Sequence, residues 1–99
     1  MKSIAVLCVT YNSYSELRAY LASVDIAAAK SSSGLKVDVF IVDNTEQDIE
    51  EVDYLDSYIN INATLISSHK NLGYFGGAKE GLKYIDIGLY DYMAITNVD

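Results

Sequence analysis

Four short polar stretches carry the side chains in this sequence that could bind a ligand, and each follows an apolar run. Hydroxyl, amide and carboxylate groups in them can donate or accept hydrogen bonds, and a tyrosine ring adds a stacking face. If the apolar runs are parallel strands, these stretches meet at one edge of a sheet, where ligands of such folds bind. They are Thr10-Tyr11-Asn12, Asp43-Asn44, Ser68-His69-Lys70-Asn71 and Asn97-Val98-Asp99.

Asp43 and the pair Asn97 and Asp99 each have a ligand-binding interpretation and a structural one. Asp43 can accept hydrogen bonds from the ribose or base of a nucleotide, or it can be a turn or helix-cap residue, since Asp and Asn cap well. Asn97 and Asp99 are two positions apart, so an amide oxygen and a carboxylate can both reach one hard cation. The alternative is an ordinary polar strand end.

The segment from Asn71 to Gly81 concentrates four of the six glycines of the chain. As a loop between a strand and a helix, it can aim backbone N–H groups at an anion. The same glycines can instead serve close packing of a helix on a sheet. Lys79 then faces either a phosphate or solvent. The first polar stretch holds no glycine, which argues against a dinucleotide-binding fingerprint.

Hydrophobic periodicity predicts an α/β domain with a parallel sheet and helices on both faces. Ser13 and Glu16 resemble a capping box before the first helix, and Asp48 with Glu51 offers a cap for the second. Tyr74 and Phe75 are expected to be packing residues and not to stack on a ligand, Phe75 especially, because it belongs to the apolar face of the third helix. The predicted strands are residues 4–9, 37–42, 63–67 and 92–96. The predicted helices are residues 14–29, a short segment between 48 and 59, and a segment whose apolar face runs from Phe75 to Leu89 and stops near Gly88.

Composition sets further bounds on the class of protein. The chain has 99 residues, enough for a single domain, and its net charge of −7 argues against nucleic acid as a partner. Cys8 is the one cysteine and lies in an apolar run, so it is predicted to be a small buried hydrophobe. No stretch is long enough to span a membrane. A cytoplasmic location is therefore expected, with membrane association open for a longer full-length protein.

Taken in order, the four stretches resemble the N-terminal half of a family 2 glycosyltransferase with the GT-A fold. The matching motifs are V-T-Y-N-S, I-V-D-N-T, N-L-G-Y-F-G-G-A-K-E-G and T-N-V-D. The resemblance covers essentially the whole chain, and its wording is closer to rhamnosyltransferase-like members. It implies transfer of a sugar from a dTDP- or UDP-linked donor to an acceptor glycan or lipid-linked glycan, in a setting such as bacterial cell-surface polysaccharide assembly.

The resemblance also assigns roles to individual residues. Asp43 binds the base or ribose, and Asn97 with Asp99 matches the family's D-x-D position, where Mn²⁺ or Mg²⁺ binds at the diphosphate. That metal acts as a Lewis acid on the departing diphosphate. Relatives often carry Asn where this chain has Ala78 or Lys79. The implied donor-binding residues are Thr10, Tyr11, Asn12, Asp43, Asn44, Asn71, Gly73, Lys79 and Asn97.

Members of the family run well past position 99 and carry the general base and acceptor site there. Residues 1–99 are therefore expected to be the donor-binding part of a longer domain, with no catalytic residue among them. The fourth strand is interior in the family, so its Met93-Ala94-Ile95 edge is expected to be exposed and to support self-association. The alternative hypothesis is a non-catalytic α/β interaction module with a vestigial nucleotide pocket.

Overall fold

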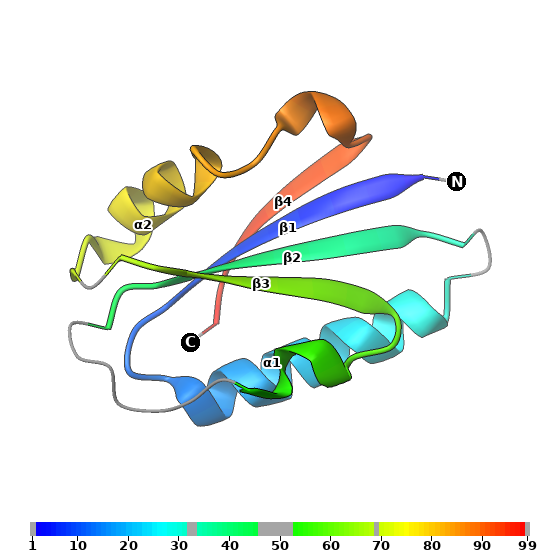
Figure 1. Cartoon of the computed structure of the whole chain (residues 1–99), viewed down its shortest axis with the longest axis horizontal. Helices are drawn as coiled ribbons and strands as arrows, with labels where there is room; N and C mark the ends of the chain where they lie inside the picture. Colours follow the sequence, from blue (N-terminus) through cyan, green and yellow to red (C-terminus); the bar gives the residue numbers. More distant parts are fainter. Residues whose placement is uncertain (1, 32–33, 46–52, 69, 99) are drawn as a thin grey trace.

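The computed structural model describes residues 2–31, 34–45, 53–68 and 70–98. Helices and strands alternate along the chain, as the hydrophobic periodicity predicts (Figure 1). The strands are β1 (Ser3–Thr10), β2 (Lys36–Asp43), β3 (Ile61–Ser67) and β4 (Tyr92–Asn97). The α-helices are α1 (Tyr14–Ala29) and α2 (Gly73–Leu82), and two 3₁₀ helices are η1 (Asp53–Ser57) and η2 (Ile87–Leu89).

The four strands form one parallel sheet in the order β3-β2-β1-β4. Helix α1 covers one face and α2 covers the other (Figure 1). The register pairs Thr10 with Asp43 and Asp43 with Ser67, while Val9 pairs with Asn97. The carboxyl ends of all four strands therefore meet at one edge of the sheet. The predicted α/β class, parallel sheet and placement of helices on both faces are confirmed.

Alternation along each strand divides the core into two layers, because successive side chains of a strand point to opposite faces. Cys8 and Ile41 pack with Leu17 and Leu21 of α1 on one face. The other layer lies under α2 and is smaller; its buried members are Ala5, Leu7, Val9, Val42, Ile66, Ala78 and Ile85. Both layers draw on the same strands, so the central strands are buried on both faces.

The glycine-rich segment was predicted to be a loop leading into the third helix, and the loop part of this prediction is wrong. Helix α2 already begins at Gly73, and Gly77 and Gly81 are buried against the sheet. Because the glycine side of the helix faces inward, Phe75 lies on the opposite side and is 84% exposed, so its predicted packing position is also wrong. The helix ends at Leu82 instead of continuing to Gly88, and Leu89 is 72% exposed.

The structure differs from the predicted caps at the starts of the first two helices. Helix α1 begins where expected, but Ser13 makes no side-chain cap bond, and its hydroxyl donates to the Tyr11 carbonyl at 2.9 Å. The predicted capping box is therefore wrong. The cap of Asp48 and Glu51 lies outside the described residues. The described part of the second predicted helix is the 3₁₀ helix η1.

Strand β4 pairs only with β1 among the residues that the structure describes. Tyr92 is 55% exposed and Ile95 is 44% exposed on it. Self-association along this edge stays a prediction. Within the described part of the chain, no helix has the length and apolar character needed to cross a membrane.

Gly81 is the point of closest approach between α2 and the sheet. A Cβ atom there would lie 2.6 Å from both Leu7 Cδ1 and Val42 Cγ2, and both of those side chains are fully buried. We expect Gly81→Ala to lower the free energy of unfolding by about 1–3 kcal/mol, because the packed layer must shift. Urea denaturation measures this change. Gly88→Ala is the control, because Gly88 is exposed and a Cβ atom there would meet only Asp86 Oδ1, at 3.4 Å. An equal loss there would contradict the packing argument.

Burial protects the thiol of Cys8 and raises its pKa from 9.0 to about 12. Because the folded chain holds this proton more tightly, the stability it contributes is complete below the ordinary thiol pKa and falls as the pH rises toward 12. We expect iodoacetamide at about pH 8 to alkylate Cys8 only after unfolding, since the thiolate is the nucleophile. Mass spectrometry of native and urea-treated samples measures this. Fast alkylation of the native chain would contradict it.

Candidate functional site

An open pocket of about 140 Å³ lies at the carboxyl edge of the sheet, between the ends of β1 and β4 and the start of α2. Six residues predicted from sequence to bind a donor line it together. Those six are Thr10, Tyr11, Asn44, Asn71, Gly73 and Asn97. The strand ends bring them together because all four strands are parallel and β4 lies next to β1.

Asn44 is the buried centre of this edge, with a side chain 1% exposed. Its Nδ2 donates to the Gly73 carbonyl at 3.0 Å, and its Oδ1 accepts from the Ser68 hydroxyl at 3.1 Å. Its backbone N–H donates to the Thr10 carbonyl at 2.8 Å. One side chain thus ties the end of β2 to the start of α2 and to the end of β3.

Gly77 leaves the space that Asn44 occupies. A Cβ atom at position 77 would lie 2.8 Å from Asn44 Nδ2 and 2.9 Å from Val9 Cγ1. Any larger residue would displace the amide from its hydrogen bonds. The glycines of α2 therefore serve close packing of helix on sheet, which was one of the two interpretations drawn from sequence.

Asp43 lies beneath the edge and does not line the pocket; its side chain is 6% exposed. Its Oδ2 accepts from the Tyr14 hydroxyl at 2.8 Å, and its Oδ1 accepts from the Thr45 backbone N–H at 2.9 Å. The second bond is the local turn that Asp side chains favour. Both carboxylate oxygens are thus engaged within the chain, as expected for the turn interpretation.

The residues of the first polar stretch differ in whether their side chains are accessible at the pocket. These residues are Thr10, Tyr11 and Asn12. Thr10 is 1% exposed, and its hydroxyl is buried without a hydrogen-bond partner among the described residues, so it offers no accessible polar group. Tyr11 is 37% exposed and lines the pocket. Asn12 has a φ of 51°, a left-handed conformation that Asn tolerates, and its N–H donates to Thr45 Oγ1 at 2.9 Å. Asn12 shapes the turn and does not line the pocket.

The start of α2 contributes Asn71 and Gly73 to the pocket. Asn71 Oδ1 accepts from the Gly73 N–H at 3.2 Å, and Gly73 has a φ of 72°, which glycine adopts without strain. Lys79 is exposed and lies two turns farther along, and it is not part of the pocket. Asp99, the predicted metal ligand, lies outside the described residues. Asn97, its predicted companion, does line the pocket.

Sequence reasoning missed Val9 and Tyr74, which also line the pocket. Tyr74 was interpreted as a packing residue, and it does pack against the core layer under α2. It also lines the pocket, and its position directly after Gly73 at the start of a helix could have placed it there. Val9 pairs with Asn97 across the sheet, and only the strand order reveals that pairing.

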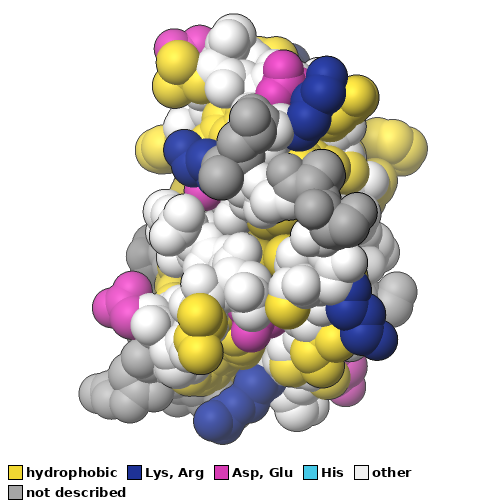
Figure 2. Space-filling view, turned by 90° about the vertical axis from the view of Figure 1, so that its right-hand side faces the viewer, with side chains coloured by type: hydrophobic (Ala, Val, Ile, Leu, Met, Phe, Trp, Pro, Cys, Tyr) yellow, Lys and Arg dark blue, Asp and Glu magenta, His cyan; other side chains and the backbone are white. Residues whose placement is uncertain are grey.

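The opposite end of the molecule, where the strands begin, is the face drawn in Figure 2. Figure 2 shows acidic, basic and apolar side chains interspersed there in small separate patches.

Away from the pocket, Tyr90 donates to Asp38 Oδ2 at 2.7 Å, and burial together with this carboxylate raises the pKa of Tyr90 to about 12. This contact fixes the segment before β4 to β2 and is structural. Among the described residues, no group of three or more His, Cys, Asp or Glu side chains gathers in a way that could hold a metal.

Comparison with protein-family models, with curated proteins and with solved structures found no match to this chain. What the fold and geometry define is therefore a small α/β domain with a polar pocket at the carboxyl edge of a parallel sheet.

Removing the Asp43 carboxylate should destabilise the edge of the sheet. Asp43→Ala leaves the Tyr14 hydroxyl and the Thr45 N–H without their acceptor, and we expect a loss of about 1–3 kcal/mol in the free energy of unfolding. Urea denaturation measures it. Tyr14→Phe removes only one of the two bonds and should cost less. Equal stability of Asp43→Ala and the unaltered chain would show that these bonds do not hold the edge.

Proposed function

We propose that this chain binds a nucleotide-diphosphate sugar, dTDP- or UDP-linked, as the donor-binding half of a family 2 glycosyltransferase of the GT-A fold. The observation that carries the proposal is the shared pocket. Six of the nine residues that the motif resemblance assigns to the donor line it, although they come from separate segments of the chain. The parallel sheet and its carboxyl-edge site agree with that assignment.

The pocket offers suitable chemistry for a phosphorylated sugar. Asn71 and Asn97 bring amide groups that can bond hydroxyl or phosphate oxygens. Gly73 and Tyr74 are the first residues of α2, so the positive end of its dipole favours an anion there. Tyr11 supplies an exposed ring edge for the base or sugar.

The size of the pocket limits what it holds. At about 140 Å³ it is smaller than the roughly 300–1,000 Å³ of common ligand pockets. We propose that it takes the sugar-diphosphate portion, while the nucleoside lies on the open edge beside Tyr11. Asp43 then acts by holding the turn that positions these groups.

The resemblance implies a divalent cation, Mn²⁺ or Mg²⁺, at this edge. Asn97 lines the pocket and can supply one oxygen ligand, and Asp99 would supply the carboxylate. When bound, the metal offsets the charge of the diphosphate and acts as a Lewis acid. A bound cation also reduces the repulsion between the negatively charged diphosphate and a chain whose own net charge is −7. By the same resemblance, the acceptor is a glycan or lipid-linked glycan, and the general base comes from sequence beyond these residues.

Titration calorimetry with UDP and dTDP, each with and without Mn²⁺, tests this function. We expect metal-dependent binding, which Asn97→Ala and Tyr11→Ala each weaken about fivefold or more through lost contacts at the pocket. Asn60→Ala and Tyr92→Ala are matched controls, because both residues are exposed and lie outside the pocket. If neither UDP nor dTDP binds to a folded sample, the proposal is refuted.

One observation favours a second candidate, a non-catalytic α/β interaction module with a vestigial nucleotide pocket. Both carboxylate oxygens of Asp43 are engaged inside the chain, so the residue given the most specific donor contact is occupied by structural bonds. In the same calorimetry, a folded chain that binds neither nucleotide, with or without Mn²⁺, supports this candidate.

A further inference from the structure

Two adjoining cavities form a groove along β3 and share Ile66, Ser67 and Tyr84. One has a volume of about 230 Å³ and the other about 360 Å³. Together they touch five consecutive residues, 64–68. Since successive side chains of a strand point to opposite faces, a groove that touches five in a row follows the edge of the strand. This strand groove shares no lining residue with the pocket at the carboxyl edge.

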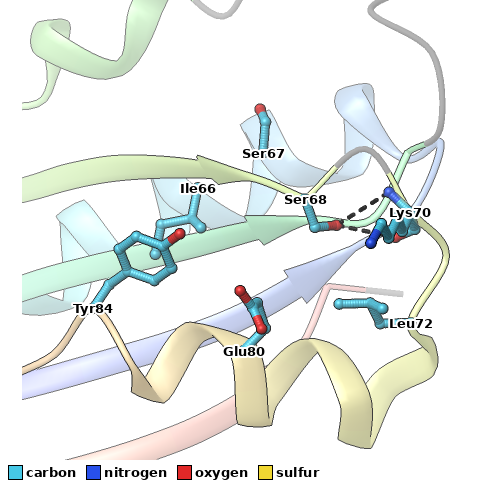
Figure 3. A pocket seen from close by; sticks show the side chains of 7 residues that line it. All are labelled: Ile66, Ser67, Ser68, Lys70, Leu72, Glu80 and Tyr84. Carbon is cyan, nitrogen blue, oxygen red and sulfur yellow. Dashed lines mark hydrogen bonds between the residues drawn. The ribbon is translucent and has the colours of Figure 1, made fainter.

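The far wall of the strand groove comes from α2 and the residues just after it. Figure 3 shows Tyr84 beside Ile66 and Glu80 pointing from α2 toward the sheet, with Lys70 and Leu72 near the carboxyl end of β3. Phe40 of β2 lines the groove beside Tyr84. A groove between an edge strand and a helix is a geometry that accepts an added peptide strand.

Strand β3 itself contains none of the residues that usually block strand addition. Among the described residues β3 pairs only with β2. The strand, Ile61–Ser67, contains no proline and no charged residue, whereas proteins commonly protect exposed edges with lysine, proline or inward charges. Its outward backbone groups can therefore bond an incoming strand.

Charge gives the strand groove a direction. Glu80 is paired with Lys83 at 3.0 Å, so its charge is largely offset. Lys70 is exposed and lies where β3 ends, which makes that end of the groove attractive to a carboxylate. A peptide parallel to β3 places its carboxyl end there.

We propose that the strand groove binds an extended peptide segment that adds as a parallel strand to β3. One apolar or aromatic side chain of the peptide packs between Phe40, Ile66 and Tyr84, and an acidic carboxyl end lies beside Lys70. Main-chain hydrogen bonds to β3 supply binding that does not depend on sequence, and the two side-chain contacts supply preference. The five lining residues span about 16 Å, which matches a pentapeptide.

A titration followed by ¹H–¹⁵N NMR tests the proposal with acetyl-Thr-Val-Tyr-Val-Asp as the probe. We expect shifts at residues 64–68 and Tyr84, with a dissociation constant below about 1 mM. The same peptide methylated at alternate backbone nitrogens cannot donate to β3, and it should bind about tenfold more weakly. Equal binding of the methylated peptide would overturn strand addition.

Substitutions at exposed positions locate the site. Tyr84→Ala should weaken the peptide about fivefold, and Lys70→Gln about threefold with loss of salt dependence, because a contact and a charge are removed. Tyr92→Ala is the matched control at the opposite edge of the sheet and should change nothing. Shifts confined to β4 or to the carboxyl-edge pocket would overturn the proposal, as would no shift at about 1 mM peptide. The proposal would also be overturned if the resonances of residues 64–68 shifted with protein concentration in the absence of peptide. A second copy of the chain would then occupy the groove.

Discussion

The amide of Asn44 is the constraint on which the carboxyl edge of this domain depends. It is buried, and its two polar ends bond Gly73 at the start of α2 and Ser68 at the end of β3. Buried polar groups are costly unless they are fully paired, so this side chain holds both segments in one position. The pairing exists only because Gly77 leaves room for it.

That constraint also connects the two binding surfaces that we propose. Asn44 lines the carboxyl-edge pocket, and Ser68, its hydrogen-bond partner, lines the strand groove. The two surfaces share no lining residue, but both draw on the chain just before and at the start of α2. Asn71 and Gly73 line the pocket, and Lys70 and Leu72 line the strand groove. A displaced amide would therefore alter both, which makes Gly77 and Asn44 poor positions for testing either one alone. Exposed residues such as Tyr11, Asn97 and Tyr84 are better suited.

Particular residues show how far sequence reasoning reaches here. The apolar runs predict all four strands, because a strand buried on both faces needs continuous hydrophobic residues. The polar residues that follow those runs predict five lining residues of the pocket, and the motif resemblance adds Gly73. The third helix was predicted, but its glycine-rich first turns were taken for a loop, because glycine is a poor helix former by intrinsic propensity, while packing against Leu7 and Val42 favours the smallest residue. Phe75 was misplaced for the same reason, since the glycines and not the aromatic ring face the sheet.

The sequence by itself determined the α/β class, the parallel sheet and the edge at which polar residues gather, because these follow from periodicity and from the direction of the strands. The tertiary structure decided which of those residues meet. Strand order places β4 beside β1, so Asn97 joins Tyr11 at the pocket. Contacts between distant segments bury Asp43 with Tyr14 and Thr45 and leave Lys79 on the outer side of α2. Local pattern cannot supply such pairings, because they depend on packing between residues far apart in the chain.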